Sequence, residues 1–292
     1  ADSALDEIQF HLFPNVLGGE LVISSASIDG ETASYENALS DSVLRVMLST
    51  PLQPQESTVI ELEFRTTVPT ELTRNYGIFT SSEGVLALAH IYPLVAVYDA
   101  DGWATEIPSE QGDVTYAEAS FYHVRVTAPD DLVLVASGSE MSHSSESSQQ
   151  VVSYASGPAR DFYLAASSDY VLTSRDTGTY IINSYAPAEM QAGSEMALRV
   201  AAAALDFFSN QYAPYPYSEF DIITSPTYAL GIEYPGMTAI NIDLYDLSAN
   251  FSGTPAPIYL ESTVAHEVGH QWFYNMSGND QRDEPWWDES LT

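Results

Sequence analysis

Alternation of apolar and polar residues marks the first part of the chain as β structure. Over residues 59–66, Ile60, Leu62 and Phe64 share one face of an extended chain, and charged side chains occupy the other face. A period of two predicts a half-buried strand. Many short strands predict an antiparallel β saddle or sandwich domain, which we place at residues 1–174. Weaker alternation predicts other strands of this domain over residues 43–48, 122–126 and 132–135. It also predicts one strand just beyond the domain, over residues 180–182.

One polar stretch breaks the alternation. Residues 137–150 are rich in serine and carry no periodic apolar side chains. We interpret this segment as a long hairpin loop and expect no chemistry from it.

The pattern becomes helical after Pro187, where residues 189–211 are rich in alanine and space their larger apolar side chains for a helix. Two strands follow, at 219–224 and 232–242. The second contains Pro235-Gly236, which favours the edge of a sheet because proline cannot donate a ladder hydrogen bond.

The last part of the chain is again helical. Pro255 is a typical first-turn residue for a helix that we expect to reach about Met276, with Gly278 as its stop. A further helix is expected to open at Asp283-Glu284-Pro285. We place this α/β region, residues 175–292, in a second domain.

Composition and charge exclude several classes of function. The 292 residues include no cysteine, which excludes a disulfide framework, a thiolate zinc site, an iron–sulfur cluster and a cysteine nucleophile. Against 41 acidic residues stand 8 basic ones, all arginine, and the formal net charge is -33. Such a surface repels phosphate backbones and anionic headgroups, so we expect no nucleic-acid partner and no electrostatic membrane binding.

Acidity without lysine also bears on location. The chain starts at Ala1 rather than methionine and shows no basic, apolar leader, so we expect that a leader has been removed. We therefore expect an extracytoplasmic or secreted protein. A bias in composition across a whole lineage, which says nothing about compartment, is the alternative.

The candidate chemistry lies in the predicted helix. His266 and His270 are four residues apart, so both imidazoles project from one helix face and can reach a single cation. Glu267 follows the first histidine and points beside the metal, where a general base must lie. Glu289 follows His270 after 18 residues, on the next predicted helix, and can supply the third ligand of a zinc site. A helix with two buried, hydrogen-bonded histidines and no metal is the alternative.

These residues resemble the signature of the M1 family of zinc aminopeptidases, in the gluzincin group. The flanking Gln271-Trp272-Phe273 and Pro285-Trp286-Trp287-Asp288 agree with it, and residues 230–236 are similar to the family's Gly-x-Met-Glu-Asn segment. That segment departs from the family at Leu230, Ile232 and Tyr234. The resemblance implies a β saddle domain followed by the first part of a thermolysin-like catalytic domain, and one Zn²⁺ per chain.

The resemblance also implies roles for individual residues. His266, His270 and Glu289 would hold the zinc, and Glu267 would act as general base. Glu233 would pair with the free α-ammonium of a peptide substrate, while Gly231 and Ile232 would bind the peptide backbone as an added strand. Glu83 is left open as a further acidic residue near the amine pocket.

The family's catalytic domain continues well beyond the third ligand, and in it a downstream tyrosine supports the transition state. We therefore expect this chain to be an N-terminal fragment ending inside the catalytic domain, weakly active or inactive, with zinc weakly held. Two other functions stay open: a gluzincin endopeptidase, which has no use for an amine anchor at Glu233, and a non-catalytic binding module on the same fold. The sequence carries no signal for the oligomeric state.

Overall fold

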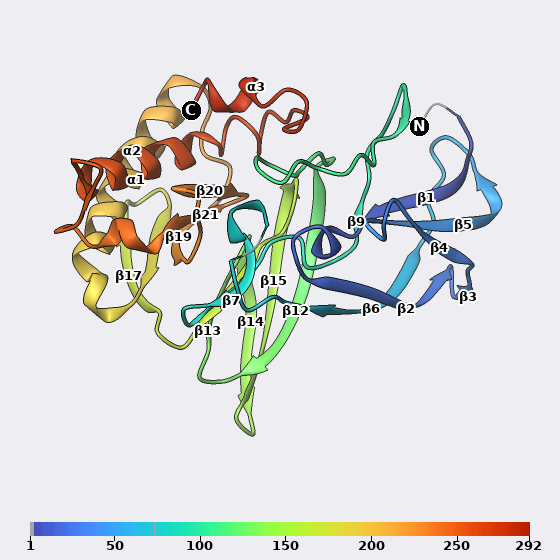
Figure 1. Cartoon of the computed structure of the whole chain (residues 1–292), viewed down its shortest axis with the longest axis horizontal. Coiled ribbons are helices and arrows are strands. Elements are labelled where there is room, and N and C mark those ends of the chain that lie inside the picture. The colour runs from blue at the N-terminus through green and yellow to red at the C-terminus, as the bar shows by residue number, and fades with distance from the viewer. Residues whose placement is uncertain (1–2, 73) are drawn as a thin grey trace.

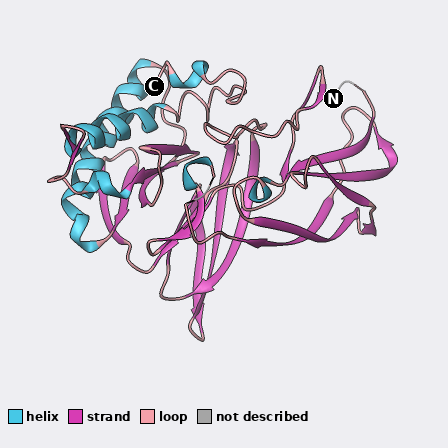
Figure 2. Ribbon diagram, viewed as in Figure 1, coloured by secondary structure: helices cyan, strands magenta, loops and turns pink. Residues whose placement is uncertain are grey.

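The computed structural model describes residues 3–72 and 74–292. Strands dominate the first half of the chain, and the α-helices gather at the other end of the molecule, around the chain's second half (Figures 1 and 2). The predicted fold class, antiparallel β sheets followed by an α/β region, is confirmed. Among the described residues, no helix is long and apolar enough to cross a membrane.

Two antiparallel sheets form the N-terminal part and bury their inner faces against each other. Phe10 and Leu44 from one sheet meet Leu21 and Ile23 from the other in a common core, as expected when sheets pack face to face. The first sheet has the order β4-β5-β1-β9 and the second the order β3-β2-β6. Their bounds are Tyr35–Ala38, Val43–Leu52, Leu5–His11 and Leu94–Val95 for the first sheet, and Glu31–Thr32, Glu20–Ile28 and Ile60–Thr67 for the second.

One residue of the best-predicted strand, Phe64, lies outside this core. Its side chain is 38% exposed, although Ile60 and Leu62 on the same face pack against the core. Phe64 pairs with Ile23, where β2 carries a bulge before Ser25. A bulge bends the strand and increases its local twist, which interrupts the burial that strict alternation predicts.

A second group of strands connects this part to the α/β region. Its three-stranded sheet has the order β12-β15-β14 and its four-stranded sheet the order β13-β16-β8-β7, beside the small pair β10-β11. The long strands of the first are the green ones that extend downward in Figure 1. Their bounds are Ser120–Pro129, Gln149–Ala159 and Ser139–Glu146; Val133–Ala136, Leu164–Ser167, Val85–Leu88 and Phe79–Ser82; and Tyr98–Asp99 and Gly102–Trp103.

The serine-rich segment belongs to this group, and its prediction as a long loop is wrong. Residues 139–146 form β14, an outer strand with mostly exposed side chains, and a two-residue turn leads into β15. Ser147 and Ser148 both have positive φ, 56° and 65°, as a type I′ turn requires. An outer strand held by backbone hydrogen bonds needs no apolar alternation, so its sequence carried no signal for a strand.

The α/β region is built on a five-stranded sheet of order β17-β18-β19-β21-β20. Strands β18, β19 and β21 are parallel, while β17 and β20 lie antiparallel at the two edges. Since β17 begins at Val171, this sheet starts a few residues before the domain boundary predicted between residues 174 and 175. The boundary itself stays a prediction. The bounds are Val171–Asp176, Ile181–Ala186, Glu219–Ser225, Met237–Asn241 and Gly231–Tyr234.

The predicted strand over residues 232–242 is in fact two strands. Pro235 and Gly236 form the turn between β20 and β21, and Gly236 has φ 77°. Proline followed by a residue with positive φ is typical of a type II turn. Only β20 lies at the sheet edge, because β21 pairs with β19 on its other side.

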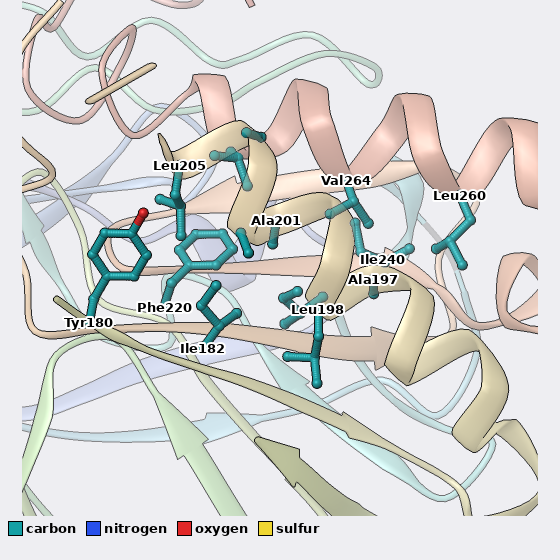
Figure 3. Close-up of a cluster of buried hydrophobic side chains, with 14 of the residues drawn as sticks. Tyr180, Ile182, Ala197, Leu198, Ala201, Leu205, Phe220, Ile240, Leu260 and Val264 are labelled. Carbon is teal, nitrogen blue, oxygen red and sulfur yellow. The ribbon is translucent and has the colours of Figure 1, made fainter. Parts of the chain in front are cut away.

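Two helices pack on this sheet and on each other. Helix α1 (Gln191–Gln211) places Leu198 and Leu205 against Ile182 and Phe220 of the sheet (Figure 3). Its buried alanines have short side chains, so Val264 of α2 (Ala256–Gly269) joins the same core. Burial of each large side chain in such a core stabilises the fold by about 1.5–3 kcal/mol.

Helix α2 ends at Gly269, about seven residues before the predicted end. Beyond it the amide groups of Asn275 and Met276 bond to carbonyls five residues back, and Tyr274 has φ 110°. Arg160 holds this wider turn by donating to the Tyr274 carbonyl at 2.9 Å. A contact from a distant segment therefore replaces the last helical turns.

The remaining elements are short. Helix α3 spans Trp286–Glu289, confirming a helix after Pro285. The strand pair β22-β23 comprises Asn250–Phe251 and Thr254–Pro255, and the 3-10 helices comprise Phe13–Asn15, Asn75–Gly77, Ala188–Met190 and Ile242–Tyr245.

Candidate metal centre

The two histidines of the motif face each other at the C-terminal end of α2. Their Nε2 atoms are 3.2 Å apart, and His266 Nε2 is 3.3 Å from Glu289 Oε2 of α3. In a tetrahedral zinc site with bonds of ~2.0–2.1 Å, neighbouring ligand atoms lie about 3.3–3.4 Å apart. The separations measured here therefore match two edges of such a tetrahedron.

Hydrogen bonds on the far side of each ring orient the histidines. His270 Nδ1 donates to the Phe273 carbonyl at 3.1 Å, since a carbonyl can only accept. His266 Nδ1 lies 3.0 Å from Thr292 Oγ1, whose own proton points to the carbonyls of Asp288 and Glu289. Both Nε2 atoms are then free as acceptors, as in metal-binding histidines whose other ring nitrogen donates a hydrogen bond to the protein.

The protonation states of His270 and Glu289 also favour a metal site. Burial lowers the pKa of His270, which keeps this imidazole neutral. The contact with His266 lowers the pKa of Glu289, which keeps this carboxylate ionised. Three acceptor atoms thus converge with no proton donor between them, and a cation is what such a set binds. The residues fit a zinc ion.

Glu267 lies beside this trio and is only 4% exposed. Its Oε2 has no hydrogen-bond partner among the described residues. Burial raises the pKa of this carboxyl well above its usual range, and nearby Glu233 adds to the shift. A carboxylate with a raised pKa is a stronger base, which suits proton removal from a water at the metal.

The Glu267 carboxylate lies close to the backbone of β20. A Cβ on Gly231 would lie 2.4 Å from Glu267 Oε1. Glycine at this position therefore provides the space that the carboxylate occupies.

Strand β20 places Glu233 beside Glu267 and His270. It is 7% exposed, and burial raises its pKa to about 8. One ligand atom from each of Glu233, Glu267 and His270 lies within 4.8 Å of the others. His270 belongs to both possible trios, and its Nδ1 is already engaged, so the two trios cannot bind separate ions at once.

All seven residues predicted for the site line one cleft of about 1270 Å³. The structure thus brings together the predicted metal ligands His266, His270 and Glu289, the predicted base Glu267, and the strand residues Gly231, Ile232 and Glu233. Glu83, left open as a further candidate, instead lies exposed in the turn between β7 and β8.

Two further residues of the site were not predicted from the sequence. Asp113, in the segment between β11 and β12, lines the cleft from the β part of the chain. Burial raises its pKa well above the usual range, with the charge of Glu233 as a further cause. Gln281 donates to the Glu233 carboxylate. Neither residue stands in a motif, so no local signal marked it.

Several known proteins are similar to parts of this chain. Residues 196–292 match the peptidase family M1 domain. Aminopeptidase N of Canis lupus familiaris is 26% identical over 249 residues, which cover 76% of this chain and 25% of the relative. Aminopeptidase M1 of Arabidopsis thaliana is 28% identical over 161 residues, which cover 53% and 18%. This chain spans about a quarter or less of the length of these curated relatives.

Solved structures show the same fold over the whole chain. A mutant of an M1 zinc metallopeptidase from Deinococcus radiodurans superposes with a TM-score of 0.66 at 18% identity, covering 100% of this chain and 62% of that one. A two-domain M1 zinc metallopeptidase bound to L-arginine gives 0.65 at 18% identity, with the same coverage. The chain therefore shares its fold, a β domain followed by an α/β region, with part of these structures.

Proposed function

Since this chain belongs to the M1 family of peptidases, we propose that it carries the metal-binding and substrate-binding segments of a zinc-dependent aminopeptidase. The observation that carries the proposal is the trio His266, His270 and Glu289, whose acceptor atoms have the spacing of zinc ligands. The relatives named aminopeptidases support a peptide with a free N-terminus as substrate.

The chemistry divides between the ion and the side chains. Zinc, when bound, would polarise the scissile carbonyl and make the attacking water more acidic. Glu267 takes a proton from that water and passes it to the leaving amine. Its unpartnered Oε2 is the atom available for this proton.

Glu233 determines where cleavage falls. Its carboxylate pairs with the α-ammonium of the substrate, a charge-assisted hydrogen bond that fixes the position of the peptide. Because Glu233 lies so close to Glu267 and His270, the peptide bond that reaches the metal is the one after the first residue. The free edge of β20, including Gly231 and Ile232, binds the peptide backbone as an added strand.

The activity is that of the whole protein, of which this chain corresponds to a part by comparison with its relatives. We propose that this chain assayed alone hydrolyses peptides weakly and holds its zinc weakly, since Glu289 lies on a four-residue helix and its side chain is 45% exposed. We also propose an extracytoplasmic location from the acidity of the chain; fractionation of the source cells tests it.

A peptide with a free N-terminus and its N-acetylated form test the proposal in the whole protein. We expect the free peptide to be cleaved much faster, and Glu233→Gln to remove most of that preference while zinc per chain stays the same. Equal cleavage of both peptides would instead indicate an endopeptidase. Zinc binding without cleavage of any peptide would indicate a binding module.

A further inference from the structure

Gln281 lies between the amine anchor and the metal site. It belongs to the segment that joins α2 to α3 and is only 2% exposed. Its Nε2 donates to Glu233 Oε1 at 2.7 Å and to Asp288 Oδ2 at 2.8 Å. One side-chain amide therefore connects a residue of β20 with a residue of α3.

Both partners of this amide are carboxylates in a crowded acidic site. Asp288 is fully buried and directly precedes the metal ligand Glu289. Asn279 Nδ2 donates to the other oxygen of Asp288 at 3.1 Å. Since buried carboxylates repel one another, donors between them are needed to hold them in place. An amide supplies two protons without adding a positive charge that would compete for the carboxylate of Glu233.

The contact with Glu233 has no substitute nearby. In the part of the chain that the structure describes, no other side chain donates to the Glu233 carboxylate. Gln271, which lies just after α2, also contacts the end of β20. It does so through hydrogen bonds to the backbone of Tyr234 and Gly236. Gln271 therefore holds the strand, whereas Gln281 holds the carboxylate itself.

We propose that Gln281 is a positioning residue that fixes the Glu233 carboxylate relative to the metal ligand Glu289. It engages one carboxylate oxygen of Glu233 and leaves the other for the substrate ammonium. It thereby determines the distance between the amine anchor and the metal, and with it the strictness of the requirement for a free N-terminus. This inference rests on the proposed aminopeptidase function.

Two variants of the whole protein separate positioning from simple structural support. Gln281→Met keeps the length of the side chain but removes both donors, and Gln281→Glu keeps the shape but adds a further carboxyl group. The matched control is Gln150→Met, because Gln150 is 4% exposed and donates to two carbonyls, of Pro129 and Leu132, in the β domain. Kinetic constants for a free peptide and its N-acetylated form are measured together with zinc per chain.

We expect Gln281→Met to raise KM for the free peptide about tenfold or more, since hydrogen bonds to charged groups are the stronger ones. The preference for the free over the acetylated peptide should fall by the same factor, with zinc content and kinetics on the acetylated peptide unchanged. Gln281→Glu should reduce the preference further, because it places like charges together. Gln150→Met should leave the preference at the wild-type value.

Three results would contradict these proposals in different ways. If Gln281→Met prefers the free over the acetylated peptide as strongly as the wild type does, the inference about Gln281 is overturned, while the proposed aminopeptidase function stands. Loss of zinc and an equal fall with both peptides shows a structural role for Gln281, and also overturns it. If the wild type itself cleaves both peptides equally, the proposed aminopeptidase function fails first, and the role assigned to Gln281 fails with it.

Discussion

Substitution of Gly231 by alanine should displace the proposed general base, Glu267, without disturbing the proposed metal ligands. The new methyl group would lie 2.4 Å from Oε1 of Glu267 and 2.7 Å from its Cδ and Cγ atoms. Ordinary contacts begin near 3.4 Å, so the carboxylate must move by about 1 Å. The three nearest atoms all belong to Glu267, and none belongs to His266, His270 or Glu289.

The size of the effect follows from that displacement. A misplacement of about 1 Å at a reacting group can cost about 10²-fold in rate, which corresponds to about 2.7 kcal/mol in the activation free energy. We expect Gly231→Ala to lower kcat by about this factor in the whole protein. Zinc per chain should stay unchanged, and the free energy of unfolding should change little, because Gly231 does not have a positive φ.

A double-mutant cycle with Glu267→Gln tests the cause. If Gly231→Ala acts through the base, it should cost little more once the base has been removed, since the two substitutions disable the same group. The assay is kcat for a free peptide in all four proteins, each checked for zinc. Fully additive effects, or a near-wild-type rate in Gly231→Ala, would refute the assignment of Glu267 as the base held against β20.

Three further predictions concern the metal, the pH dependence of stability and the core. Elemental analysis of the whole protein, metal-loaded and then desalted, should give about one zinc per chain, lost in His270→Ala; zinc in the variant equal to wild type would exclude His270 as a ligand. Burial raises the pKa of Asp161 to about 7, while burial keeps nearby His90 neutral with a pKa of about 3. The folded state therefore holds a proton on Asp161 that the unfolded state releases from pH ~4 upward, so the stability of wild type relative to Asp161→Asn should fall from pH 4 to 7. Urea unfolding of both proteins at several pH values checks this, and a constant difference would contradict it. Leu205→Ala should lower the free energy of unfolding by about 2–5 kcal/mol, because Leu205 is fully buried between α1 and the sheet; a loss below 1 kcal/mol in urea unfolding would show that the core closes around the gap.

The metal ligands could be predicted because their geometry is local. His266 and His270 share one face of any helix that includes both, whatever that helix packs against. Strands such as β5 and β19 were predicted for the same reason, since alternation and turn residues act over a few neighbouring positions. Glu289 reaches the histidines through the single segment, residues 270–285, that joins α2 to α3.

The tertiary structure decided everything that depends on contacts between distant segments. Just beyond the early end of α2, Arg160 donates a hydrogen bond to the Tyr274 carbonyl, although the two residues are 114 positions apart. The contact of Gln281 with Glu233 spans 48 residues, and Asp113 reaches the cleft from the β part of the chain.

The sequence by itself therefore determined the type of those elements that have a clear periodic pattern, and the spacing of the proposed metal ligands. Only the packing of β20 against α2 and the segment after it determined how the acidic residues are held around them, because such contacts arise from the burial of faces that no short stretch of sequence describes.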